Sequence, residues 1–137
     1  MFGKPKVLAV DDNSISLAAI EQELKDEYEV IPLNSGTRAL KYLQRERPDL
    51  ILLDIQMESK DGIETLKEIR DMEKCKDIPV IMLTSMRDKQ MVVESAKLGV
   101  KGYVIKPFTK QDLRARVDSV LKEKKGHQWD LRDMGLR

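Results

Sequence analysis

The sequence predicts an α/β fold, namely a doubly wound sheet of five parallel strands with helices on both faces. Four short aliphatic runs lack an alternation of apolar and polar residues, which indicates strands that are buried on both faces. Amphipathic segments separate these runs, and right-handed crossovers then place helices on both sides of the sheet. The runs lie at residues 7–10, 50–53, 80–83 and 103–105.

Local signals set the order of elements in the first half of the chain. Asn13 and Ser14 are favoured N-cap residues in front of an amphipathic segment, and Pro48 breaks the second helix. These signals predict alternating strands and helices that lead to a strand ending at Asp54. The elements are a strand at 6–10, a helix at 15–26, a strand at 29–32, a helix at 37–47 and a strand at 50–54.

The second half of the chain continues the same alternation. Pro79 suits the start of a strand, where a missing N–H is tolerated, Gly99 ends the fourth helix, and Thr109 caps the fifth. The expected elements are a helix at 61–72, a strand at 80–83, a helix at 85–98, a strand at 103–105 and a helix from 110 onward.

Length and composition favour one compact domain. After residue 124 the apolar periodicity fails, which predicts a domain at 5–124 and a linker stub or C-terminal tail at 125–137. The 137 residues include 25 Lys and Arg against 24 Asp and Glu, so no basic field suggests nucleic-acid binding. The single Cys75 excludes an internal disulfide and fits a reducing cytoplasm, and no apolar stretch is long enough to span a bilayer. A soluble, cytoplasmic domain is therefore expected.

Five polar residues close the buried runs. Asp11 and Asp12 follow the first run, and Asp54, Thr84 and Lys106 follow the others. Because binding sites of open parallel sheets form at the carboxyl edge of the strands, these side chains are expected to meet there. The carboxylates would repel one another, and a hard cation such as Mg²⁺ would relieve the repulsion. For Asp11 and Asp12 taken alone, an acidic surface loop is the simpler alternative.

The residues beyond the acid pair suit phosphoryl chemistry. Asp54 is poorly placed as a helix cap, because residues 56–59 intervene before the next helix, and a carboxylate can attack phosphorus to form an acyl phosphate. Thr84 could donate to a phosphoryl oxygen or could cap the following helix. Lys106 precedes Pro107, and a cis peptide bond there would aim the ammonium over the pocket, whereas a lysine at a strand end is usually solvated.

Five segments carry a distinctive combination of residues. They read V-L-A-V-D-D-N at 7–13, L-L-D-I-Q-M at 52–57, D-G at 61–62, M-L-T-S at 82–85 and G-Y-V-I-K-P-F at 102–108. In combination they resemble the receiver domain of two-component response regulators, and the resemblance covers residues 5–124. It implies a flavodoxin-like (βα)5 fold, in a stand-alone chemotaxis-type protein or as the N-terminal receiver of a larger regulator.

The resemblance also implies a magnesium-dependent phosphoacceptor site. Asp54 accepts the phosphoryl group and contributes to the metal site. Asp12 binds Mg²⁺ directly, Asp11 helps mainly through water, and the backbone carbonyl of Gln56 supplies a further ligand.

A phosphorylation-activated switch follows from the same resemblance. The chain is therefore not expected to be an enzyme, although receiver domains promote their own phosphorylation and dephosphorylation. Thr84 and Lys106 bind the phosphoryl oxygens, and Tyr103, otherwise an ordinary strand-edge residue, turns inward when Thr84 moves. The fourth helix, fifth strand and fifth helix then change as the surface for a downstream partner, an output domain or a second copy in a homodimer.

The phosphoryl donor is expected to be another molecule. His127, the only histidine, lies outside the predicted domain. A sensor histidine kinase or a phosphotransfer protein is therefore the implied donor, with small phosphodonors as an alternative. Direct binding of nucleic acid or of a membrane is not expected.

Some positions depart from the family pattern. Glu58 stands where a proline commonly follows the loop methionine, and Gln56 and Met86 occupy variable positions that tune how fast the acyl phosphate hydrolyses. The partner surface is expected to be basic, although a solvated face would look the same. Its cationic residues are Arg87, Lys89, Lys97, Lys101, Lys110, Arg114 and Arg116.

Three other functions fit the sequence less well. A phosphatase with an aspartate nucleophile would need a second aspartate two residues later, and Gln56 at that position cannot protonate a leaving group. A flavodoxin-like cofactor binder would need a loop that cradles phosphate after the first strand, where Asp11 and Asp12 would repel it. A receiver-like module without chemistry would not need to keep all five polar residues.

Overall fold

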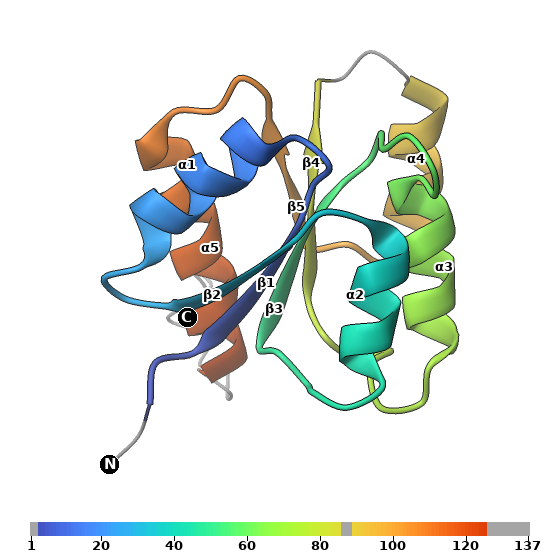
Figure 1. Ribbon diagram of the computed structural model, residues 1–137, viewed down its shortest axis with the longest axis horizontal. Helices are drawn as coiled ribbons and strands as arrows, with labels where there is room; N and C mark the ends of the chain where they lie inside the picture. The colour runs from blue at the N-terminus through green and yellow to red at the C-terminus, as the bar shows by residue number, and fades with distance from the viewer. Residues whose placement is uncertain (1–2, 86–88, 126–137) are drawn as a thin grey trace, which may run out of the picture.

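The computed structural model describes residues 3–85 and 89–125, which form one sheet of five parallel strands (Figure 1). The strand order is β2-β1-β3-β4-β5, so the chain winds outward from β1 in both directions. This topology confirms the predicted doubly wound sheet. The strands are β1 (Lys6–Val10), β2 (Glu29–Leu33), β3 (Leu50–Asp54), β4 (Val80–Thr84) and β5 (Gly102–Ile105).

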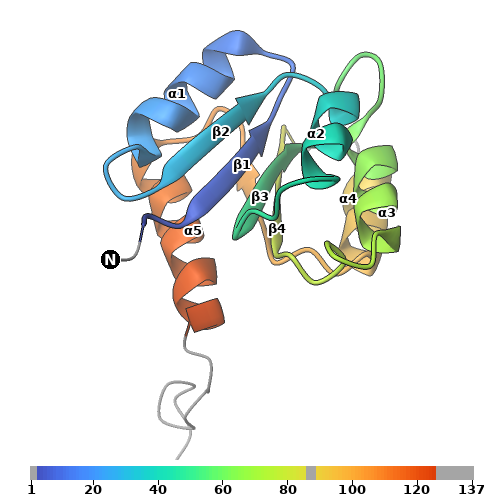
Figure 2. The same cartoon turned by 60° about the horizontal axis from the view of Figure 1, so that its bottom comes forward.

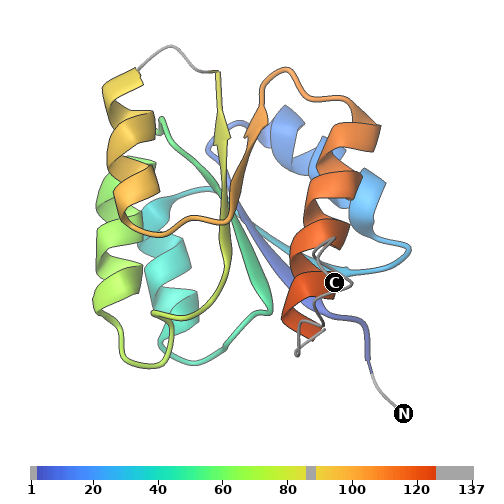
Figure 3. The ribbon, with the colours of Figure 1, turned by 180° about the vertical axis from the view of Figure 1, so that it is seen from behind.

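Helices cover both faces of the sheet. Figures 1 and 3 show α1 and α5 on one face, and α2, α3 and α4 on the other. The helices follow the strands in strict alternation, as the sequence pattern predicts. They are α1 (Ser14–Leu24), α2 (Gly36–Leu43), α3 (Gly62–Asp71), α4 (Lys89–Lys97) and α5 (Lys110–Lys125).

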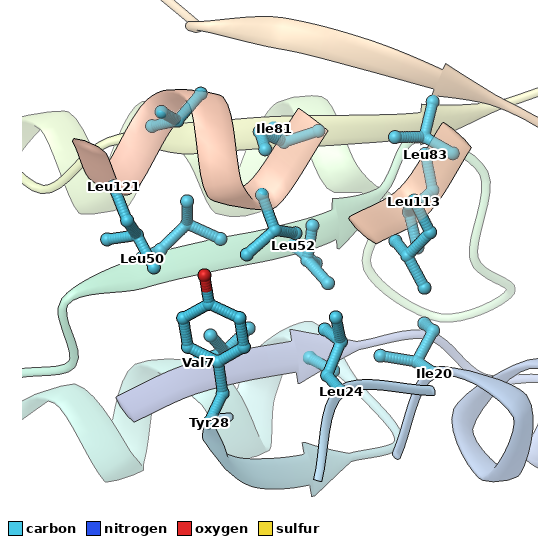
Figure 4. Close-up of a cluster of buried hydrophobic side chains, with 14 of the residues drawn as sticks. Val7, Ile20, Leu24, Tyr28, Leu50, Leu52, Ile81, Leu83, Leu113 and Leu121 are labelled. Carbon is cyan, nitrogen blue, oxygen red and sulfur yellow. The ribbon is translucent and has the colours of Figure 1, made fainter. Parts of the chain in front are cut away.

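The sheet separates two hydrophobic cores, which explains why its central strands lack polar alternation. In β3, Leu50 and Leu52 point into the core under α1 and α5, while Ile51 and Leu53 point into the core on the other face. All four side chains are fully buried. Figure 4 shows the first of these cores, where side chains of β1, β3 and β4 meet those of α1 and α5.

Several helix ends differ from the sequence-based expectation. α1 ends at Leu24 rather than at residue 26, because Glu27 and Tyr28 donate their N–H groups to the Leu24 carbonyl in a closing turn. α2 ends at Leu43 rather than at residue 47, and the Tyr42 carbonyl accepts the N–H groups of residues 45 and 46. Ser85, the expected start of the fourth helix, is not helical.

Four sequence-based expectations lie outside the described residues. They concern Met86, Arg87, His127 and the tail expected at 125–137, of which only residue 125 is described. Within residues 3–85 and 89–125, none of the helices combines the length and the apolarity that crossing a membrane requires.

The topology brings the carboxyl ends of four strands to one edge. Figure 2 shows the parallel course of β1 and β2 beside β3. Val10 pairs with Leu53, so the residues that follow them, Asp11 and Asp54, become neighbours. Asp54 in turn pairs with Leu83, one residue before Thr84. The sheet register itself therefore assembles the candidate site.

Candidate functional site

One ammonium group bridges two buried carboxylates at the carboxyl edge of the sheet. Lys106 Nζ lies 2.7 Å from Asp11 Oδ2 and 3.4 Å from Asp54 Oδ2. Asp11 is fully buried and Asp54 is 6% exposed, while Lys106 is half-buried. The structure thus brings together three of the five strand-end residues through ion pairs.

The backbone after β5 places Lys106. Its N–H donates to the Thr84 carbonyl at 2.8 Å, which extends the β4–β5 pairing by one residue. The Lys106–Pro107 peptide bond is cis, the isomer that the X–Pro sequence allows. The two ion pairs hold the ammonium over the carboxylates, so the alternative of a solvated lysine is wrong.

The third carboxylate, Asp12, is exposed and meets the loop that follows β3. Asp12 Oδ2 accepts the N–H of Glu58 at 2.9 Å. Asp11 Oδ1 accepts the N–H of Asn13 at 2.9 Å, which fixes the turn into α1. One oxygen each of Asp11, Asp12 and Asp54 lie within 4.8 Å of one another. Asp11 and Asp12 therefore belong to a cluster with Asp54, and the alternative of an isolated acidic surface loop is excluded.

This acid cluster fits a hard divalent cation. Three carboxylates against the one ammonium of Lys106 leave two formal negative charges. Asp11 Oδ2 is buried and, among the described residues, makes no hydrogen bond of standard geometry, so its ion pair with Lys106 is its stabilising contact. Carboxylate oxygens with an exposed side are the ligand set that Mg²⁺ takes while keeping several waters.

Burial and charge change the acidity of the site. Burial and the nearby Asp11 carboxylate raise the pKa of Asp54 to about 7, against the opposing effect of Lys106. Burial alone would lower the pKa of Lys106, but its contacts with Asp11 and Asp54 outweigh burial and raise it. Lys106 therefore stays cationic, and added positive charge would favour the carboxylate form of Asp54.

The Gln56 loop approaches the phosphoacceptor candidate. The N–H of Gln56 points at Asp54 Oδ1 over 3.4 Å, and the Gln56 side chain is exposed. The proposed role of the Gln56 carbonyl as a metal ligand stays a prediction.

Thr84 and Tyr103 lie on neighbouring strands. Thr84 is the last residue of β4 and is 5% exposed. Tyr103 is half-buried, and its hydroxyl oxygen lies 3.0 Å from the Val92 carbonyl oxygen and 2.8 Å from Ser95 Oγ, both on α4. Ser95 is fully buried and also donates to the Val92 carbonyl at 2.8 Å. Tyr103 therefore joins β5 to α4.

Sequence reasoning missed Ser95. Its signal is a small polar residue three positions after Val92, on the face of α4 that packs against the core. A second correction concerns Arg114, which pairs with Glu23 at 3.7 Å and with Glu27 at 3.1 Å. Arg114 therefore contacts the region of α1, whereas Lys89, Lys97, Lys101, Lys110 and Arg116 are exposed.

Comparisons with known proteins agree with this geometry. The chain matches the model of the response regulator receiver domain over residues 7–118, and it belongs to that family. It is 37% identical over 120 residues to the probable transcriptional regulator ycf27 of Porphyridium aerugineum, an overlap of 87% of this chain and 49% of that protein. The chain spans about half the length of the ycf27 regulators that it matches.

Solved structures show the same fold. The chemotaxis response regulator CheY4 of Vibrio cholerae superposes with a TM-score of 0.80 at 32% identity, covering 86% of this chain and 99% of that one. The Mn²⁺-bound form of response regulator Rcp1 gives a TM-score of 0.73 at 32% identity, covering 86% and 92%. The fold and the family place the chain in two-component signalling.

Proposed function

We propose that this chain is a switch that accepts a phosphoryl group on Asp54, in a Mg²⁺-dependent reaction, from a sensor histidine kinase or a phosphotransfer protein. The observation that carries the proposal is the position of Asp54. It ends the central strand β3, nearly buried, with one oxygen 3.4 Å from Lys106 Nζ and within 4.8 Å of the oxygens of Asp11 and Asp12. The proposed nucleophile, its charge partner and the proposed metal-binding acid pair thus lie together at the carboxyl edge of the sheet.

The proposed step transfers phosphorus from nitrogen to oxygen. A carboxylate oxygen of Asp54 attacks the phosphorus of a phosphohistidine, the P–O bond forms as the P–N bond breaks, and the departing imidazole nitrogen takes a proton from solvent. Lys106 offers a cation to the phosphoryl oxygens, and Thr84 offers a hydroxyl donor. The product is an acyl phosphate on Asp54.

The metal site belongs to the same proposal. Asp11, Asp12 and Asp54 would hold Mg²⁺ with the Gln56 carbonyl. When bound, Mg²⁺ offsets the repulsion between Asp54 and the incoming phosphoryl oxygens. The three carboxylate oxygens within 4.8 Å of one another support this assignment, as does Rcp1, which is known in a Mn²⁺-bound form.

The output surface is proposed to be α4, β5 and α5. Val93 on α4 and Ile105 on β5 are each 54% exposed, so both side chains are accessible to a partner on this surface. Among relatives, ycf27 regulators are about twice as long as this chain and CheY4 is about as long. A covalently joined output domain, a separate partner and a second copy are the candidates for this surface.

The test of the proposal is phosphorylation of the purified chain by acetyl phosphate, with and without Mg²⁺. One acid-stable, base-labile phosphoryl group is expected, and only with the metal. The donor is a small molecule, so this test does not depend on knowing the cognate kinase.

Thr84→Ala is expected to accept phosphate on Asp54 but to lose most of the linked change in α4. A hydrogen bond to a charged acceptor contributes roughly 1.5–3 kcal/mol, which shifts a two-state population by about one to two orders of magnitude. NMR of the phosphorylated variant is the measurement, with Thr37→Ala on the exposed start of α2 as control. Shifts of α4 and Tyr103 as large as in the parent would show that Thr84 does not couple them.

Ser95→Ala is expected to loosen Tyr103 before any phosphorylation. The variant removes one of the two α4 groups that contact the Tyr103 hydroxyl, while the Val92 carbonyl remains. A neutral hydrogen bond contributes about 0.5–1.5 kcal/mol, so the rotamer populations of Tyr103 should change by about 2- to 10-fold. Side-chain NMR couplings of Tyr103 measure this, with the exposed Ser119→Ala as control. Unchanged couplings would rule out the anchoring role of Ser95.

A further inference from the structure

We infer that the amino terminus of α3 positions Asp54 and the metal-binding loop, and that Gly62 is the residue that sets their distance. Asp61 caps this helix, and Gly62 is its first residue. The inference rests on the proposed phosphoacceptor role of Asp54. It assigns positioning, and no contact with the reacting atoms, to Gly62.

Gly62 packs directly on the backbone of the phosphoacceptor. Its N–H donates to the Ile55 carbonyl at 2.7 Å. A Cβ atom at residue 62 would lie 2.1 Å from the Asp54 carbonyl oxygen and 2.8 Å from Ile55 Cα. These neighbours are backbone atoms, so a change of side-chain rotamer cannot relieve the clash. Any other residue must push α3 and the end of β3 apart, from 2.1 Å to at least 3.0 Å.

The hydrogen bond between Gly62 and Ile55 closes a loop whose N–H groups contact two of the three carboxylates, Asp54 and Asp12. Between Ile55 and Gly62, the N–H of Gln56 points at Asp54 Oδ1, and the N–H of Glu58 binds Asp12 Oδ2. A shift at Gly62 would therefore move the phosphoacceptor and the loop that holds Asp12. The displacement acts on the geometry of the site as well as on packing.

A reciprocal cap makes the amino terminus of α3 rigid. Asp61 Oδ1 accepts the N–H of Glu64 at 2.9 Å, and Glu64 Oε1 accepts the N–H of Asp61 at 3.2 Å. Thr65 Oγ1 donates to the Asp61 carbonyl at 3.0 Å. The reciprocal bonds of Asp61 and Glu64 thus fix the first turn of α3, so this turn can hold the end of β3 in place.

The chain contains a matched control at the start of α2. Ser35 caps α2 by accepting the N–H of Arg38, and Gly36 is the first residue of the helix. A Cβ atom at residue 36 would lie 2.1 Å from Thr65 Oγ1. That hydroxyl holds the first turn of α3 through the Asp61 carbonyl, so Gly36→Ala would disturb α3 as well, and Ser35→Ala is the matched control.

Three variants separate positioning from stability. Gly62→Ala and Asp61→Ala alter the amino terminus of α3, and Ser35→Ala makes the matching cap change in α2. For each, three quantities are measured: the unfolding temperature, the phosphorylation rate with acetyl phosphate at saturating Mg²⁺, and Mg²⁺ affinity. The last is taken from amide NMR shifts of residues 11, 12 and 54, so it does not require phosphorylation.

Gly62→Ala should slow phosphorylation at saturating Mg²⁺ by about 10- to 100-fold, because a displacement near 1 Å costs on that order. It should also weaken Mg²⁺ binding. Asp61→Ala should change both quantities in the same direction by less. Ser35→Ala should lower the unfolding temperature, because it removes an N-cap, and should stay within about twofold of the parent rate.

Three outcomes would overturn the inference. They are a parent-like rate and Mg²⁺ affinity in Gly62→Ala, a loss of rate in Ser35→Ala equal to that in Asp61→Ala, and, if Gly62→Ala does not fold, parent-like values in Asp61→Ala. Failure of the proposed function looks different: the parent chain itself would gain no phosphoryl group on Asp54. The Mg²⁺ affinities would then still decide whether α3 positions the acids.

Discussion

Asp54→Asn is expected to abolish phosphorylation of this chain by acetyl phosphate, a loss of at least about 100-fold in the rate of labelling. Asparagine keeps the size of the side chain and can still accept the Gln56 N–H, but its amide lacks the anionic oxygen that attacks phosphorus. No other carboxylate ends β3 beside Lys106. Labelling with radioactive phosphodonor, or a mass increase of the intact chain, measures the effect.

The opposite end of the same strand offers the control. Asp49 stands just before β3, where its Oδ2 accepts the N–H of Lys6 at 2.8 Å, and Asp49→Asn should label like the parent. Asp54→Asn should not lower the unfolding temperature, because it removes one of three mutually repelling carboxylates. Labelling of Asp54→Asn at the parent rate would contradict the assignment of the phosphoacceptor.

Asp12→Asn is expected to weaken Mg²⁺ binding by about tenfold or more, since even indirect partners of a metal ligand are worth 10- to 100-fold in affinity. The parent should bind Mg²⁺ weakly alone and more firmly with beryllofluoride, which mimics a phosphoryl group and adds a negatively charged ligand. Titration followed by amide NMR shifts measures both affinities.

Asp26 is exposed and follows the end of α1. Asp26→Asn is therefore the control for this titration and should bind Mg²⁺ like the parent. In Asp12→Asn the amide oxygen can still accept the Glu58 N–H, so a loss of affinity reflects the lost charge. Equal Mg²⁺ affinity of parent and Asp12→Asn, or equal affinity with and without beryllofluoride, would contradict the proposed metal site.

The fold was predictable because the strands are buried on both faces. Leu50, Ile51, Leu52 and Leu53 leave no polar alternation, which is typical of a strand between two layers of helices. The ends of helices were less predictable. The apolar pattern of α1 ends at Leu24, and residues 25 and 26 do not continue it. The chain turns at Leu24, and this turn brings Tyr28 into the core.

The acid cluster was predictable for a topological reason. Parallel strands deliver their carboxyl ends to one edge, so Asp11, Asp54 and Lys106 meet without any further information. The contacts of Ser95 and Gly62 were not predictable in this way. The contact of Ser95 depends on the angle at which α4 packs on β5, and the contact of Gly62 depends on the distance between α3 and β3. The spacing of residues along the sequence predicts neither the angle nor the distance.

The most direct measurement is to locate the phosphoryl group on the parent chain. Acetyl phosphate and Mg²⁺ are added, the acyl phosphate is reduced with borohydride, which converts the modified aspartate into homoserine, and peptides are sequenced by mass spectrometry. We expect homoserine at position 54 alone, and none when Mg²⁺ is chelated. Homoserine at position 11 or 12, or modification that persists without Mg²⁺, would contradict the assignment of Asp54 as the Mg²⁺-dependent phosphoacceptor.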